Sequence, residues 1–145
     1  MIEFEIIGLP APQGSKSAIV IGGKARIIEG KTGGQRSKHK AWRDVVASTA
    51  RDIAGENPPL KGPLSIAVEF RMPKPSSRPK SHHGWHSVSP DKDKLMRATL
   101  DGLQVGGLVA NDSQFAWGSW QAFEVDGWTG AIVSIRELGR SPRHG

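Results

Sequence analysis

The chain has 145 residues, and its composition excludes several classes of protein before any motif is considered. It contains 20 Lys and Arg against 14 Asp and Glu, and the resulting net charge of +6 favours a polyanionic partner. The absence of Cys rules out a disulfide framework, thiolate catalysis and cysteine zinc sites. Because no apolar run approaches the roughly 18 residues of a membrane span and no signal-peptide pattern opens the chain, we expect a cytoplasmic protein that is not bound to a membrane.

Apolar patterning in the first half of the chain predicts a strand, a hairpin and a helix. Residues 2–8 begin with alternating apolar and acidic positions, which is typical of a half-buried strand. Residues 18–28 indicate two short strands around a Gly-Gly turn. Apolar residues recur at helical spacing over 37–54, so we expect a helix there with Trp42 in the core.

The second half predicts a strand over 64–72, a loop over 73–89, a helix over 94–104 and a final hairpin. The loop is rich in Pro, Ser and His and short of aliphatic side chains, and long loops of this kind tend to be functional. The hairpin consists of strands over 114–124 and 130–137 that are joined at an Asp-Gly turn.

These elements together predict an α+β fold with two main helices and a mixed or antiparallel sheet. The chain shows no internal repeat and no sign of a second domain. We therefore expect one domain over residues 1–139, followed by a basic tail over 140–145.

Two stretches of the chain concentrate positive charge. Seven basic residues and a single acid lie between Lys24 and Arg43, and no acid lies between Glu69 and Asp91. Such stretches attract nucleic-acid phosphates, although a solvated protein surface is the alternative interpretation. The residues expected to contact DNA phosphates are Lys16, Lys38, Lys40, Arg43, Lys74, Arg78, Lys80, Lys92 and Lys94.

Aromatic and histidine side chains leave more than one interpretation open. Trp85 has no predicted core to join, so it is a candidate to stack on an unpaired base. Trp117, Trp120 and Trp128 either fill the core or leave one ring at an interface. The loop histidines fit phosphate contacts or solvent exposure better than a zinc cluster, because adjacent loop histidines diverge and no fourth ligand is evident. These histidines are His82, His83 and His86.

Three aspartates carry the candidate catalytic chemistry. Asp91 and Asp93 lie where the chain enters the predicted helix, and Asp112 follows a glycine-rich reversal that would return it to the same neighbourhood. Carboxylates that converge repel one another unless a cation intervenes, and Mg²⁺ prefers such hard oxygen ligands. A cation held there would activate a water to attack phosphorus, and Arg97 would stabilise the transition state. The alternative is that these aspartates only cap a helix and begin a turn.

Three short motifs in this region resemble the signature of RusA-type Holliday junction resolvases. The motifs are PDKDKL over 90–95 followed by Arg97, LDGL over 100–103, and NDSQ over 111–114. The family pattern runs approximately PDxDNLxKxxxDAL, a short glycine-containing turn, and DDxQV. The segment PAPQGSK over 10–16 is similar to the N-terminal loop of many phage-borne members.

The resemblance implies a magnesium-dependent endodeoxyribonuclease, for which Mn²⁺ can substitute. Such an enzyme acts as a homodimer on four-way DNA junctions in DNA recombination and repair, in a bacterial or phage-infected cell. Paired nicks in opposed strands leave 5′-phosphate and 3′-hydroxyl ends. By the resemblance, Asp91, Asp93 and Asp112 match the metal-binding catalytic acids, and Arg97 stands where the family usually has a catalytic lysine.

The sequence departs from the family pattern at three positions. Lys94 replaces an Asn beside the proposed metal, Arg97 replaces the Lys, and Asn111 replaces the first Asp of the DD pair. Arg97 keeps the positive charge but cannot act as a general acid near neutral pH. Two other functions remain open: a basic nucleic-acid-binding module without catalysis, and a nuclease for other branched or single-stranded DNA.

Overall fold

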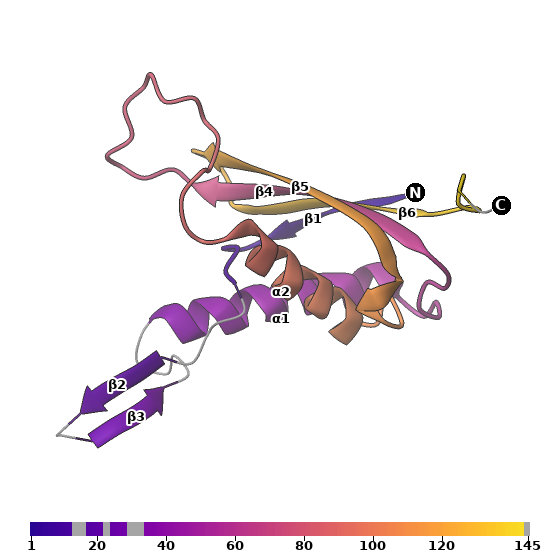
Figure 1. Cartoon of the computed structure of the whole chain (residues 1–145), viewed down its shortest axis with the longest axis horizontal. Coiled ribbons are helices and arrows are strands. Elements are labelled where there is room, and N and C mark those ends of the chain that lie inside the picture. The colour runs from indigo at the N-terminus through magenta and orange to yellow at the C-terminus, as the bar shows by residue number, and fades with distance from the viewer. Residues whose placement is uncertain (13–16, 22–23, 29–33, 144–145) are drawn as a thin grey trace.

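The computed structural model describes residues 1–12, 17–21, 24–28 and 34–143. Its main body is a β-sheet with both helices on one side, and the loop 74–90 extends past one end of the sheet (Figure 1). This architecture confirms the expected α+β class. The elements in chain order are β1 (Ile2–Ile7), β2 (Ser17–Ile21), β3 (Lys24–Ile28), α1 (Gly34–Ala54), β4 (Leu64–Pro73), α2 (Lys92–Val105), the 3₁₀ turn η1 (Asp112–Gln114), β5 (Phe115–Val125) and β6 (Gly130–Glu137).

The four-stranded sheet has the order β1-β6-β4-β5 and is mixed. Strand β5 runs parallel to β4, whereas β6 is antiparallel to both β4 and β1. Strands β2 and β3 pair antiparallel with each other, as the predicted hairpin requires. Both helices begin before their predicted first residues, α1 by three positions and α2 by two.

The predicted hairpin of the last two strands is wrong, because β4 lies between β5 and β6. Strand β4 is an inner strand of the sheet: its backbone pairs with β5 on one edge and with β6 on the other, and all five apolar residues on one of its faces are buried in the core. The short connection between β5 and β6 crosses the end of β4. There Arg71 of β4 donates from Nε to the Trp128 carbonyl at 3.1 Å, and its guanidinium lies 4.1 Å from the Trp128 ring centroid.

The core fills the space between the sheet and the two helices. Trp42 of α1 is completely buried, as predicted, and its indole N–H donates to the Thr99 hydroxyl of α2 at 3.2 Å. The hydroxyl of Thr99 in turn donates to the Leu95 carbonyl, so both buried polar groups are satisfied. In the part of the chain that the structure describes, no helix is long and apolar enough to span a bilayer.

Helices α1 and α2 approach closely because Gly102 has no side chain. A Cβ at Gly102 would lie 2.7 Å from the Cβ of Val46. Beside this contact, Arg43 of α1 pairs with Asp101 of α2, with Nε and Oδ2 2.8 Å apart. The close contact fixes the position of α2, and both ends of this helix carry candidate catalytic residues.

Candidate active site

Two of the predicted acids lie at the N-terminus of α2. Asp91 is the N-cap residue and Asp93 lies in the first helical turn, where the helix dipole favours negative charge. The Asp91 side chain makes no capping hydrogen bond and is exposed to solvent. The ammonium group of Lys94 lies 3.7 Å from Oδ2 of Asp91 and partly neutralises it. Arg97 follows one turn later and is exposed.

The side chain of Lys92 binds the backbone of the loop that leads into this helix. Its ammonium group donates to the carbonyls of Val88 and Pro90, at 2.9 and 2.8 Å. Burial lowers the pKa of Lys92, against an opposing effect of the Asp91 charge. Lys92 therefore supports the backbone that carries Asp91.

Asp112 lies at the opposite end of α2. Its backbone N–H donates to the Gln104 side chain at 2.9 Å, and the neighbouring Asn111 caps η1. Gln104 is eleven residues beyond Asp93, which corresponds to about 16 Å along a helix axis. Within the described residues, no three His, Asp or Glu side chains are grouped so that they could hold a metal ion. The expected return of Asp112 to the other two acids therefore does not occur within one chain.

The loop 74–90 is anchored to the end of β5 by a pair that sequence reasoning missed. Arg78 binds Glu124 through three hydrogen bonds of 2.8 to 3.1 Å, and only 1% of the Glu124 side chain is exposed. The hydrogen bond from Arg78 lowers the pKa of Glu124, although burial opposes the shift. No local pattern signals this pair, because 46 positions separate its members.

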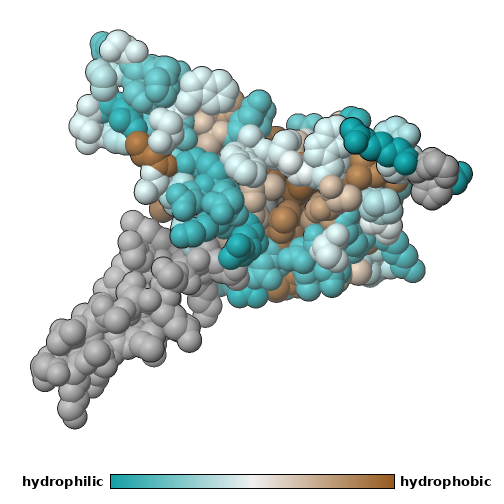
Figure 2. All heavy atoms as spheres, viewed as in Figure 1, coloured by the Kyte–Doolittle hydropathy of each residue, from teal (hydrophilic) through white to brown (hydrophobic). Residues whose placement is uncertain are grey.

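Backbone hydrogen bonds also anchor the loop to β5. The N–H of His86 donates to the Ala122 carbonyl, and the N–H of Glu124 donates to the Gly84 carbonyl. Trp85, which had no predicted core to join, stacks on Phe123 with ring centroids 4.7 Å apart and is half exposed. The loop is therefore held against β5, and Figure 2 shows that its surface is largely hydrophilic.

The loop histidines form no metal cluster within the described residues. Nδ1 of His82 accepts from the N–H of Gly84 at 3.1 Å, so this nitrogen carries no proton and the nearby Glu124 does not form an ion pair with it. Burial is the main cause that lowers the pKa of both His82 and His86. His86 is buried, and its Nδ1 has no hydrogen-bond partner.

The structure divides the predicted phosphate contacts into three groups. The first group is held by shorter contacts within the protein and consists of Arg43, Arg78 and Lys92. The second is exposed and consists of Lys74, Lys80 and Lys94, although Lys74 and Lys94 each lie within 4 Å of an aspartate. The third lies outside the described residues or side chains and consists of Lys16, Lys38 and Lys40. DNA contact by the exposed group stays a prediction.

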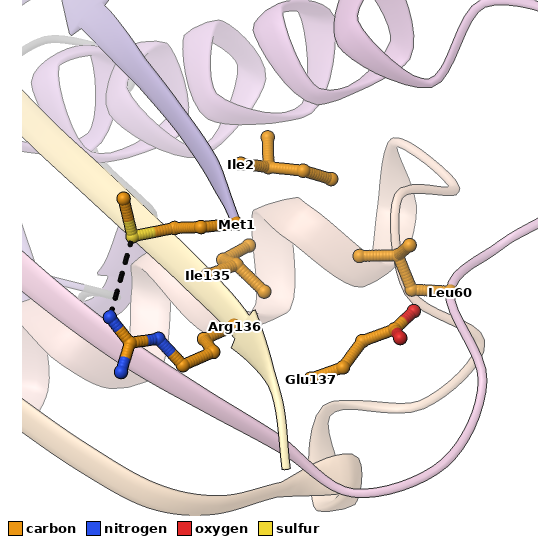
Figure 3. Close-up of a pocket in the computed structure, with 6 residues that line it drawn as sticks. All are labelled: Met1, Ile2, Leu60, Ile135, Arg136 and Glu137. Atoms are coloured by element: carbon orange, nitrogen blue, oxygen red, sulfur yellow. Dashed lines mark hydrogen bonds between the residues drawn. The ribbon is translucent and has the colours of Figure 1, made fainter. Parts of the chain in front are cut away.

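Two tryptophans of β5 are exposed, which contradicts the interpretation that all three late tryptophans fill the core. The exposed fraction is 67% for Trp117 and 47% for Trp120. A pocket of about 300 Å³ lies elsewhere, among Met1, Ile2, Leu60, Ile135, Arg136 and Glu137 (Figure 3). It contains none of the three aspartates. Asp91 and Asp93 are exposed and Asp112 is half-buried, so their side chains lie at the surface.

Comparison with known families supports a nuclease. The model of a family described as Endodeoxyribonuclease RusA matches residues 21–136. The matched stretch contains all of α2 together with Asp91, Asp93 and Asp112 at its ends. A search of the curated proteins finds no match.

Proposed function

This chain belongs to the endodeoxyribonuclease RusA family, and we propose that it resolves four-way DNA junctions as a metal-dependent homodimer. The observation that carries the proposal is the placement of Asp91 and Asp93 at the N-terminus of α2, within the stretch that the family model matches. The exposed ammonium group of Lys94 lies 3.7 Å from Asp91, and such a cation suits a phosphate backbone.

The donor chemistry suits Mg²⁺, but one chain does not complete the site. Carboxylate oxygens are the ligands that Mg²⁺ prefers, and when bound the ion would polarise a phosphate oxygen and lower the pKa of a water. Asp91 and Asp93 would supply two ligands from one end of α2. Asp112, the third predicted ligand, lies at the other end.

A homodimer would resolve this separation. A two-fold axis that sets the two α2 helices in opposite directions brings the partner subunit's Asp112 toward Asp91 and Asp93. The same axis produces two equivalent sites, which matches the approximate two-fold symmetry of a four-way junction. Arg97, one turn inside α2, would then face the phosphate and stabilise its developing charge.

The nature of the DNA substrate follows from the exposed part of the site. The loop 74–90 carries Lys80 and the half-exposed ring of Trp85, and such a ring can stack on an unpaired base at a branch point. We place this activity in DNA recombination and repair, in the cytoplasm of a bacterial or phage-infected cell.

Cleavage of a synthetic four-way junction tests the proposal. With Mg²⁺ or Mn²⁺ we expect paired nicks, and with a chelator we expect none. Asp93→Asn should reduce cleavage by at least 100-fold, on the order of the loss for a removed catalytic electrostatic group, while junction binding is retained or strengthened because a negative charge is removed. Asp52→Asn, an exposed aspartate on α1, is the matched control and should cut normally.

Three results would contradict this function. Normal cleavage by Asp93→Asn would show that the acid is not catalytic. Binding without cleavage under all metal conditions would favour a nucleic-acid-binding module. Equal cleavage of junction, flap and single-stranded DNA would indicate a nuclease without junction selectivity.

A further inference from the structure

Strand β5 has a free edge over residues 115–121. One side of the strand pairs with β4 along its whole length. On its other side, the described residues provide a single bridge, between Trp85 and Phe123, and the flanking hydrogen bonds reach only Ala122 and Glu124. The remaining backbone groups of this edge, from Phe115 to Gln121, are therefore available to another strand.

The pairing of β5 with β4 shifts register at Ala116, and apart from this irregularity the edge lacks the features that usually protect an edge strand. Its sequence, FAWGSWQ, contains no charge and no proline, although 23% of the whole chain is charged. Both exposed tryptophans of β5 lie in it. Figure 2 shows hydrophobic residues in the middle of the molecule, between the sheet and the helices, with hydrophilic residues around them. An unprotected apolar edge of this length is a template for strand pairing.

We propose that β5 pairs antiparallel with β5 of a second copy of this chain, about a two-fold axis at Gly118. The two ends of the free segment determine this register, because η1 precedes Phe115 and the loop occupies the edge from Ala122 onward. Gly118 is the midpoint between Phe115 and Gln121. The sheet of each subunit would then continue into that of its partner.

Side chains across this axis are complementary in size. The register sets Trp117 opposite the partner's Ser119, so this large ring meets a small residue on the same face. Gly118 lies on the two-fold axis, at the centre of the interface. A nucleic acid is a poor alternative occupant, because this segment offers no cation to a phosphate.

The same register also affects how far Asp112 of one subunit lies from Asp91 and Asp93 of the other. It directs the partner subunit's η1 toward the end of β5 at which residues 84–86 of the loop before Asp91 are anchored. The partner's Asp112 would therefore approach the N-terminus of α2. This consequence rests on the proposed function, whereas the strand pairing itself does not.

A single cysteine tests the register directly, because the natural chain has none. Residues directly opposite each other in an antiparallel pair have Cα atoms about 4.5–5.5 Å apart, within the range of a disulfide. A Cβ at Gly118 has Ile66 Cγ2 as its nearest neighbour at 3.5 Å, so the substitution fits. Mild oxidation of Gly118→Cys should give a covalent dimer.

The matched control is Ala116→Cys, in the same free edge of β5. Its counterpart in the partner is four positions from the opposite residue, about 13 Å away along the strand, so no disulfide should form. A dimer of Ala116→Cys without one of Gly118→Cys would overturn the register.

The oligomeric state tests the interface without a disulfide. In sedimentation experiments, the wild-type chain should be a dimer and Trp117→Lys should raise the dissociation constant at least tenfold. Ile53→Lys, at an exposed apolar position on α1, should leave the dimer intact. A monomeric wild type, or a Trp117→Lys dimer of unchanged affinity, would overturn the pairing. A cross-linked dimer that cuts no DNA would instead contradict only the proposed function.

Discussion

The carboxylate of Glu124 lies at the centre of the contacts that hold the loop 74–90. The carboxylate accepts hydrogen bonds from Arg78, and the backbone N–H of Glu124 donates to the Gly84 carbonyl. His82 and His86 lie near it, and burial lowers the pKa of both rings because it disfavours their charged forms. The nearby cations are Arg78 and Lys92, so any further positive charge here is unfavourable.

Docking of this loop should weaken as the pH falls. The pKa values of His82 and His86 are lowered from 6.5, so the stability that their neutral forms contribute is complete above that pH and is lost as the pH falls through the folded-state values. The lowered pKa of Glu124 adds a second loss below about 4.5, its ordinary value. An NMR titration should show both rings protonating below pH 6.5, together with a shift of the Trp85 indole signal.

Glu124→Gln provides the control for this titration. Glu124 raises the pKa of His86 through its charge, so the variant should lower that pKa further. Protonation of His86 above pH 6.5 in the wild type, or a Trp85 signal that does not change with pH, would contradict the assignment.

Among the helices and strands, the contact between α1 and α2 depends on Gly102, which has no side chain. Gly102→Ala places a methyl group 2.7 Å from Val46 and 3.1 Å from the Arg43 carbonyl. Overpacking of this kind costs about 1–3 kcal/mol, against a helix-propensity gain of about 1 kcal/mol. We therefore expect the free energy of unfolding to fall by up to about 2 kcal/mol in urea denaturation.

The matched control for this substitution is Gly139→Ala. A Cβ at Gly139 meets nothing within 4 Å, so its stability should change by less than about 0.5 kcal/mol. A Gly102→Ala variant more stable than the wild type would show that the helices separate without cost.

Apolar periodicity was sufficient to locate the elements but not to pair them. It located the strands and helices, and it placed Trp42 in the core. It failed for the last two strands because nearness in sequence favoured a hairpin, whereas β4 lies between them and pairs its backbone on both edges. The same limit explains the missed Arg78–Glu124 pair, since a long-range contact leaves no local pattern.

For the whole molecule, the decisive fact is the length of α2. Local sequence identified the acids at both ends but could not give the distance between them. Once the helix is known to extend from Lys92 to Val105, Asp112 cannot join Asp91 and Asp93 within one chain. The proposed function therefore requires that each site take residues from two subunits.

Mixing two inactive variants should restore cleavage. In a heterodimer of Asp93→Asn with Asp112→Asn, one shared site carries both substitutions and the other carries none. One intact site cuts one strand, so a supercoiled plasmid with an extruded cruciform should become a nicked circle. The wild-type homodimer, with two intact sites, should give the linear form.

A second mixture distinguishes shared sites from separate ones. Asp91→Asn with Asp93→Asn leaves a substitution at both sites of every heterodimer, because both positions lie at the same end of α2. This mixture should stay inactive, which controls for nonspecific rescue by subunit exchange. If sites lay within single chains, neither mixture would cut, and inactivity of the Asp93→Asn and Asp112→Asn pair despite proven heterodimers would refute the shared site.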